Sequence, residues 1–190
     1  MTESQDVIAI ATDETRLWLE KAVIGLNLCP FAKSVYVKNQ VHFAVSQTRD
    51  PEVLLESLRE ELIQLVAHSP SARDTTLLIA PYALSDFLDF NDFLADADDI
   101  LDDLDLLGQI QIASFHPDFQ FAGTAANDIT NCTNRSPYPT LHLIREESID
   151  RAVKAFPQAE SIFEVNMQTL ETMGAEGWAA LNVGRGKIRP

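Results

Sequence analysis

The sequence is poor in cysteine and has no long apolar run, and both absences narrow the class of protein. Its 190 residues include only Cys29 and Cys132, too few for the disulfide framework of a small secreted protein. No apolar run approaches the roughly 20 residues that span a bilayer. The opening residues, MTESQDVIAIATDE, lack the basic start and the apolar stretch of an export signal. We therefore expect a cytoplasmic protein with free thiols.

Positive charge is missing from a long central stretch. Between Asp74 and Asn134 there is no Lys or Arg, while twelve aspartates occur, so this stretch supplies most of the net charge of −15. The electrostatic field of so many negative charges repels phosphate backbones and anionic lipid heads, so we expect neither nucleic acid nor a membrane as partner. The basic cluster is the C-terminal tail, residues 184–190 (GRGKIRP), expected to be solvated or loosely docked.

Apolar residues recur in patterns that predict both helices and strands. Helical spacing, with Asp50 and Pro51 as one clear helix start, predicts helices over 13–28, 50–68, 85–107, 148–156 and 159–174. Runs of β-branched and aromatic residues predict extended segments over 35–47, 75–80, 109–116 and 140–146, the first of them a strand or a hairpin broken at Asn39.

The order of these elements predicts an α/β fold. We expect a single-domain sandwich over residues 1–190, with a parallel βαβ unit and a mixed sheet. The last two strands are expected to pair antiparallel around a long polar loop. Thr12 is the expected cap of the first helix, and Pro157 separates the last two helices.

The aspartates of residues 85–107 surround an apolar helical stripe. The D-x-D-x-D-G pattern of a calcium loop is absent, because Ile100 and Leu101 stand where ligands and glycine belong. A solvated helix face is the favoured interpretation. One alternative for the whole protein is a non-catalytic acidic interaction module that contacts a basic partner.

The segment from His116 to His142, HPDFQFAGTAANDITNCTNRSPYPTLH, carries most of the candidate site residues. A connector this long usually has a functional reason, and its prolines restrict the backbone. A guanidinium beside amides and hydroxyls can bind carboxylate or phosphate. The candidate substrate-binding residues are Asn131, Asn134, Arg135, Ser136 and Tyr138. Alternatively, Arg135 pairs internally with Asp118 or Asp128 and fixes the loop.

His116 is the candidate general acid or base, with Asp118 to orient its imidazole. The alternative is a simple turn at Pro117, with His116 a satisfied surface residue. A second function would be metal binding by His116 and His142 with Asp118 or Cys29, a donor set acceptable to zinc or iron. Because this spacing is not diagnostic, no metal is favoured, and the sequence names no cofactor.

Cys29 is the candidate nucleophile, and its reactivity depends on the local helix geometry. At the C-terminus of the first helix, the helix dipole would oppose ionisation of the thiol. If Pro30 instead starts a short second helix, the thiol would lie at its positive end and be activated. A third alternative is a buried, inert cysteine.

Three motifs, NLCPFAK, FHPDFQFAG and NRSPYPTLHLIRE, resemble in order those of a bacterial family known as domain of unknown function 1415. The resemblance covers nearly the whole chain and implies a bacterial, cytoplasmic, one-domain protein, without an activity to carry over. It singles out Cys29, His116, Pro117, Asp118, Asn134, Arg135 and His142. The family pattern has tyrosine where this chain has Cys132, which disfavours a redox pair with Cys29.

These residues together favour an enzyme acting on a small anionic metabolite or an acyl-type substrate. His116 and Asp118 would supply acid–base chemistry, Arg135 would hold the anion, and Cys29 would be a nucleophile or a wall of the site. The hypothesis makes one spatial prediction: Cys29, His116 and Arg135 should face a shared cavity.

Overall fold

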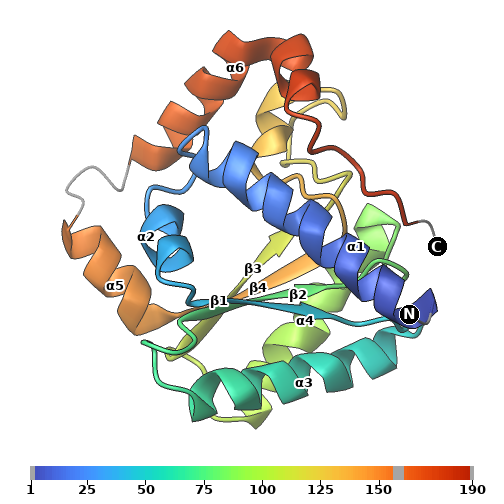
Figure 1. Ribbon diagram of the computed structural model, residues 1–190, viewed down its shortest axis with the longest axis vertical. Coiled ribbons are helices and arrows are strands. Elements are labelled where there is room, and N and C mark those ends of the chain that lie inside the picture. Colours follow the sequence, from blue (N-terminus) through green and yellow to red (C-terminus); the bar gives the residue numbers. More distant parts are fainter. Residues whose placement is uncertain (1–2, 156–160, 189–190) are drawn as a thin grey trace.

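A four-stranded mixed sheet is covered by helices on both faces in the computed structural model, which describes residues 3–155 and 161–188 (Figure 1). One face carries α3 (Pro51–Ala67) and α4 (Phe87–Asp103). The other face carries α1 (Glu3–Trp18) and its π-helical continuation η1 (Leu19–Ile24). The other helices described are α2 (Ala32–Val37), the 3-10 helix η2 (Ile129–Thr133) in the long loop, α5 (Glu146–Ala155) and α6 (Ile162–Ala180). The predicted α/β sandwich is confirmed.

The strand order is β1-β2-β4-β3, which comprises β1 (Val41–Val45), β2 (Thr75–Ile79), β4 (Thr140–Arg145) and β3 (Ile110–Phe115). Strands β1 and β2 are parallel and are connected through α3, which is the predicted βαβ unit. Strand β4 is antiparallel to both neighbours, so the strands flanking the long loop pair as predicted. His142 on β4 lies opposite Leu77 on one side and Ala113 on the other.

The face under α3 and α4 holds the larger core. Asp50 caps α3 by accepting from the Glu52 amide at 2.9 Å, as the Asp-Pro start predicts. The buried leucines of α3 are Leu54, Leu58, Leu62 and Leu65, each no more than 1% exposed. Each contributes roughly 2 kcal/mol through its burial. Helix α4 buries its aromatic stripe here and leaves its aspartates in solvent.

Two predictions about the N-terminal third are wrong. Helix α1 begins at Glu3, so Thr12 lies inside the helix instead of capping it. A hairpin over 35–47 does not form, because residues up to Val37 belong to α2 and the strand is confined to β1. The chain breaks at Asn39 because that residue is left-handed, with φ 56°, and its amide bonds the Tyr36 carbonyl at 3.0 Å as a helix end.

The C-terminal segment lies against the end of the long loop. The Gly186 amide donates to the Pro137 carbonyl at 2.9 Å, and the Ile188 amide donates to the Tyr138 hydroxyl at 3.3 Å. A side chain at position 186 would overlap Tyr138, since a β-carbon there would lie 2.1 Å from the ring. Arg189 of the basic tail and Pro157 lie outside the described residues. Among the helices described, none is long and apolar enough to cross a membrane.

Candidate functional site

His116 is fully buried beneath α4, at the end of β3. Its Nδ1 accepts from the Asp118 amide at 3.0 Å, so Nε2 carries the hydrogen and donates to the Leu84 carbonyl, also at 3.0 Å. The ring packs 5.1 Å from that of Phe90. Burial is the main cause that lowers the pKa of His116. Both nitrogens are therefore occupied, an arrangement that favours a structural role in the turn.

Asp118 does not orient the imidazole through its carboxylate. The carboxylate pairs with Arg185 of the C-terminal segment, on the surface. The backbone amide of Asp118 makes the contact to His116 instead. The predicted neighbours are thus together in space, but the carboxylate points to a different partner.

Arg135 serves the loop that contains it. Its Nε donates to the Phe119 carbonyl at 3.1 Å, and an Nη donates to the Ala126 carbonyl at 2.6 Å. No ion pair of Arg135 with Asp118 or Asp128 occurs among the residues described. The internal role that we considered is therefore favoured, with backbone carbonyls as partners in place of carboxylates.

The other loop candidates are also bonded within or near the loop. Asn131, with no exposed surface, accepts from the Phe121 amide at 3.0 Å and the Thr124 hydroxyl at 2.8 Å, and donates to the Ala125 carbonyl at 2.9 Å. Ser136 donates to the Tyr138 carbonyl at 2.5 Å. The Tyr138 hydroxyl donates to Glu14 of α1. These polar groups hold the loop in place.

A cavity of about 750 Å³ lies on the opposite face of the sheet. Its walls are mainly apolar and come from the sheet and from α1, η1, α2, α5 and α6; they include Trp18, Val23, Leu77, Ala113, Phe115 and Ile149. Of the predicted site residues, Cys29, Asn134 and His142 line it, whereas His116 and Arg135 do not. The structure thus brings together a different trio from the one the sequence suggested.

His142 faces this cavity from the middle of the sheet. The Thr75 hydroxyl donates its single hydrogen to the Leu143 carbonyl at 2.6 Å, so it must accept from His142 Nε2, 2.7 Å away. Nδ1 is then the unprotonated nitrogen, and no donor to it occurs among the described residues. Burial lowers the pKa of His142 to about 4. The imidazole is therefore neutral at pH 7 and presents a lone pair.

Cys29 lies between η1 and α2 and is partly buried in the cavity wall. Pro30 leads into the short helix, as in the second geometry we considered, and the Phe31 and Ala32 amides bond the cysteine and lower its pKa. Burial has the larger effect and raises the pKa of the thiol. Cys132 is also a free thiol, buried in a different cluster. Cys29 is therefore protonated at neutral pH in the free protein.

Charged side chains line the cavity where it opens to solvent. Lys38 and Arg151 contribute positive charge and are exposed, and Asp74 is the acid among the lining residues. Asp74 accepts from the Ser148 hydroxyl at 2.7 Å, and an Arg151 Nη lies 3.9 Å from its carboxylate. The rim therefore has an excess of positive charge, in contrast to the chain as a whole.

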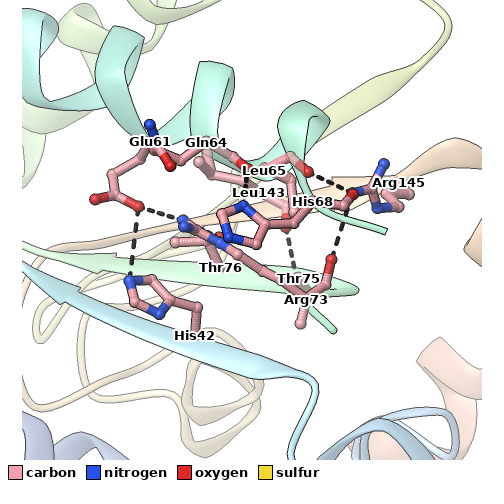
Figure 2. A network of polar contacts seen from close by, with 10 residues as sticks. All are labelled: His42, Glu61, Gln64, Leu65, His68, Arg73, Thr75, Thr76, Leu143 and Arg145. Atoms are coloured by element: carbon pink, nitrogen blue, oxygen red, sulfur yellow. Dashed lines mark hydrogen bonds and ion pairs between the residues drawn. The ribbon is translucent and has the colours of Figure 1, made fainter. Parts of the chain in front are cut away.

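Sequence reasoning missed a second polar region, at the end of α3 (Figure 2). Arg73 is buried and bonds both Glu61 and Thr76, next to a pocket of about 440 Å³ that His42 also lines. Arg145 donates to the carbonyls of the last turn of α3, including that of His68 at 2.7 Å. No motif signals these arginines, because Arg145 bonds backbone carbonyls and Arg73 bonds the isolated side chains of Glu61 and Thr76. The region joins α3 to β4: the charge of Arg73 is paired with Glu61, whereas Arg145 bonds only backbone carbonyls and its buried Nε has no partner among the described residues.

The candidate metal ligands do not converge. His116 packs against α4 on one face of the sheet, while His142 lines the cavity on the other. The two histidines therefore cannot share one ion. No group of three or more His, Cys, Asp or Glu side chains suited to a metal ion occurs in the described part of the chain.

These features define an α/β protein with a ligand-sized, mainly apolar cavity against one face of its sheet. The chain belongs to the family described as "Protein of unknown function (DUF1415)", whose sequence profile matches residues 10–180. The resemblance noted in the sequence is thus confirmed, and the matched range includes Cys29, Asn134 and His142. No match was found among curated proteins or solved structures.

Proposed function

We propose that the protein is an enzyme acting on a small anionic molecule with an apolar body, bound in the cavity beside His142. The observation that carries the proposal is an unpartnered imidazole nitrogen in a mainly apolar cavity of about 750 Å³. Sites for small molecules typically enclose about 300–1,000 Å³ and combine apolar walls with a few polar groups. The cavity has both properties.

The rim supports an anionic substrate. Lys38 has no ion pair among the described residues. Arg151 donates to the Ser148 hydroxyl at 2.9 Å, and its distance of 3.9 Å from the Asp74 carboxylate is too long for a tight ion pair. Both side chains could turn toward a bound carboxylate or phosphate. Because the chain has a net charge of −15, this positive rim is also a local point of attraction for an anion.

His142 would be the acid–base group. A pKa of about 4 makes it a weak base in the free protein. A bound anion favours the imidazolium, so it would raise this pKa toward the neutral range and couple substrate binding to proton transfer. Cys29 lines the same cavity and would be a nucleophile or a wall, in the part that we first assigned beside His116.

Binding is tested by filling the cavity. Ala113→Phe places a ring among the lining residues, whereas Ala95→Phe makes the same change on the exposed side of α4. We expect alkyl and aryl carboxylates to raise the Tm of the wild type and of Ala95→Phe, but not of Ala113→Phe. Equal shifts in all three proteins would place binding elsewhere and overturn the proposal.

Catalysis is tested separately from binding. His142→Gln keeps a donor for Thr75 but removes the basic nitrogen, so a bound molecule should persist while its conversion, followed by NMR, is lost. Conversion at an unchanged rate would exclude His142 as the acid–base group. If the wild type binds carboxylates in the cavity but converts none of them, the enzymatic part of the proposal is wrong and the protein is a binding protein.

A second candidate function, an acidic interaction module, rests on α4. Its aspartates are exposed, and the ion pair found there among the described residues joins Asp103 to Arg59 at 2.8 Å. The remaining acids are available to a basic partner. Capture of a polylysine-bearing probe that weakens with salt, and that is lost when Asp92, Asp96 and Asp99 become Asn, would support it. Salt-independent capture would contradict it.

A further inference from the structure

Three side chains of the cavity lining, His142, Asn134 and Asn166, present hydrogen-bond acceptors that have no donor among the described residues. His142 presents Nδ1 as a lone pair, because its Nε2 hydrogen is donated to Thr75 at 2.7 Å. An acceptor enclosed by apolar walls is satisfied only by a donor. The group that meets His142 must therefore carry a hydrogen.

Two amides in the lining extend this set of acceptors. Asn166 of α6 is 5% exposed and donates its Nδ2 to the Leu28 carbonyl at 2.9 Å. Asn134 donates its Nδ2 to the Ser114 carbonyl at 3.3 Å. Because each amide nitrogen bonds a carbonyl, each amide is oriented; each leaves its oxygen as an acceptor and keeps the second hydrogen of its nitrogen. Neither oxygen has a donor among the described residues.

The rim is of the opposite kind. Lys38 and Arg151 are donors only, and both are charged and exposed. Apolar side chains such as Val23, Leu77 and Phe115 form much of the remaining wall. The site thus combines acceptors within the cavity, an apolar wall and cationic donors at the surface.

From this arrangement we infer that the ligand is an apolar hydroxy acid, with its hydroxyl donating its hydrogen to His142 Nδ1 and its anionic group at Lys38 and Arg151. This inference rests on the proposed function. It adds the chemical class of the substrate and the orientation of the substrate in the cavity. A carbonyl or an ether in place of the hydroxyl has no hydrogen for His142 Nδ1, so it should bind more weakly there. The anion is a carboxylate or a phosphate-type group, which share the same chemistry at the rim.

The probes are 4′-hydroxybiphenyl-4-carboxylate, its 4′-methoxy analogue, the corresponding hydroxy phosphonate, and 4-hydroxybiphenyl, which has no anion. We expect the hydroxy acid to bind wild-type protein at least tenfold more tightly than the methoxy acid, because the methoxy group leaves His142 Nδ1 unpaired. Removal of the anion is expected to weaken binding by a similar factor. The carboxylate and phosphonate arms show which anion the rim prefers. Calorimetry measures all four.

Variants assign each preference to its residue. His142→Phe retains a ring but removes the acceptor, and it should reduce the hydroxy-over-methoxy preference to less than threefold. His42→Phe makes the same change beside the other pocket and should leave the preference intact. Lys38→Gln should weaken the binding of both acids equally and spare 4-hydroxybiphenyl. In the wild type, the hydroxy acid should shift the ¹⁵N resonance of His142 Nδ1, which needs no variant to fold.

The outcomes separate this inference from the proposed function. Equal affinity for the hydroxy and methoxy acids, or a preference that survives His142→Phe, would overturn the donor assignment and leave the proposed function standing. The same holds if simple carboxylates bind in the cavity while no probe does. If neither simple carboxylates nor the probes bind, both proposals fail together.

Discussion

The long loop and the cavity use polar side chains in opposite ways. The loop over residues 116–139 is dense in polar groups, and those of Asn131 and Arg135 bond neighbouring backbone, at distances of 2.6–3.1 Å. The cavity is mainly apolar, yet His142 Nδ1 is without a donor among the described residues. In this protein, the segment richest in polar residues uses them to fix its own backbone. Binding capacity depends on which polar atoms the fold leaves unpaired.

The largest effect on stability should follow from removing the hydrogen bonds that fix the loop. Asn131→Ala removes three partly buried hydrogen bonds of a side chain that has no exposed surface, and it leaves the Phe121 amide without its acceptor. We expect a loss of about 4 kcal/mol in the free energy of unfolding, measured with urea. Asn127→Ala, at an exposed position of the same loop, is the control and should change it by less than about 0.5 kcal/mol. Similar losses in both would mean that the loop is not held by Asn131.

The second largest effect should be a pH dependence of the free energy of unfolding, of about 3 kcal/mol, caused by His142 in the cavity. The folded pKa of His142 is about 4, below the ordinary value of 6.5, so the unfolded chain binds its proton more readily. The contribution of His142 to stability is therefore complete above pH 6.5 and is lost as the pH falls toward 4. Urea unfolding between pH 4 and 8 should show a steeper slope for wild type than for His142→Phe. Identical slopes would contradict a desolvated imidazole.

A third, smaller effect on stability should come from the packing of the C-terminal segment against the end of the loop. In Gly186→Ala the new β-carbon would lie 2.1 Å from the Tyr138 ring, so the segment must shift, at a cost of about 2 kcal/mol. Gly184→Ala is the matched control, because a β-carbon there meets nothing within 4 Å. Limited proteolysis should cut the tail of the first variant much faster. Equal cleavage would show that the tail is not fixed through Gly186.

The smallest effect should come from the cavity at high pH. His142→Phe loses one hydrogen bond to Thr75 but adds an apolar ring to apolar walls, so these two changes largely offset each other. At pH 8 the free energy of unfolding should change by less than about 1 kcal/mol. A loss as large as that of Asn131→Ala would mean that His142 supports the fold, and the contrast between loop and cavity would disappear.

Local signals in the sequence predicted most of the fold. The Asp50-Pro51 start, the apolar strand expected over 75–80 and the alternating segments expected over 109–116 and 140–146 all correspond, within a residue, to elements of the structure. The N-terminal helix was placed too late because Asp13 and Glu14 resemble a first turn. Glu14 instead bonds Tyr138, 124 residues away, and no local pattern reports such a contact.

The candidate site was harder to predict, because it depends on register. His142 lies on β4, and His116 directly follows the antiparallel neighbour β3. From the sequence alone, each side chain could point to either face of the sheet. Pairing of Ala113 with His142 places His116 three residues beyond that pair, on the other face. A shift by one residue would reverse these faces. The unpartnered state of Nδ1 depends further on Thr75 bonding Leu143, which only coordinates reveal.

The edge contact between Trp18 and Phe115, with ring centroids 5.2 Å apart, gives the protein a built-in optical reporter. Trp18 belongs to the cavity wall, and Trp178 is the second of the two tryptophans in the chain. With Trp178 replaced by Phe, indole emission would come from a single place, and its wavelength would follow the polarity of whatever occupies the interior. Unlabelled compounds could then be screened in a fluorimeter without an assay for turnover.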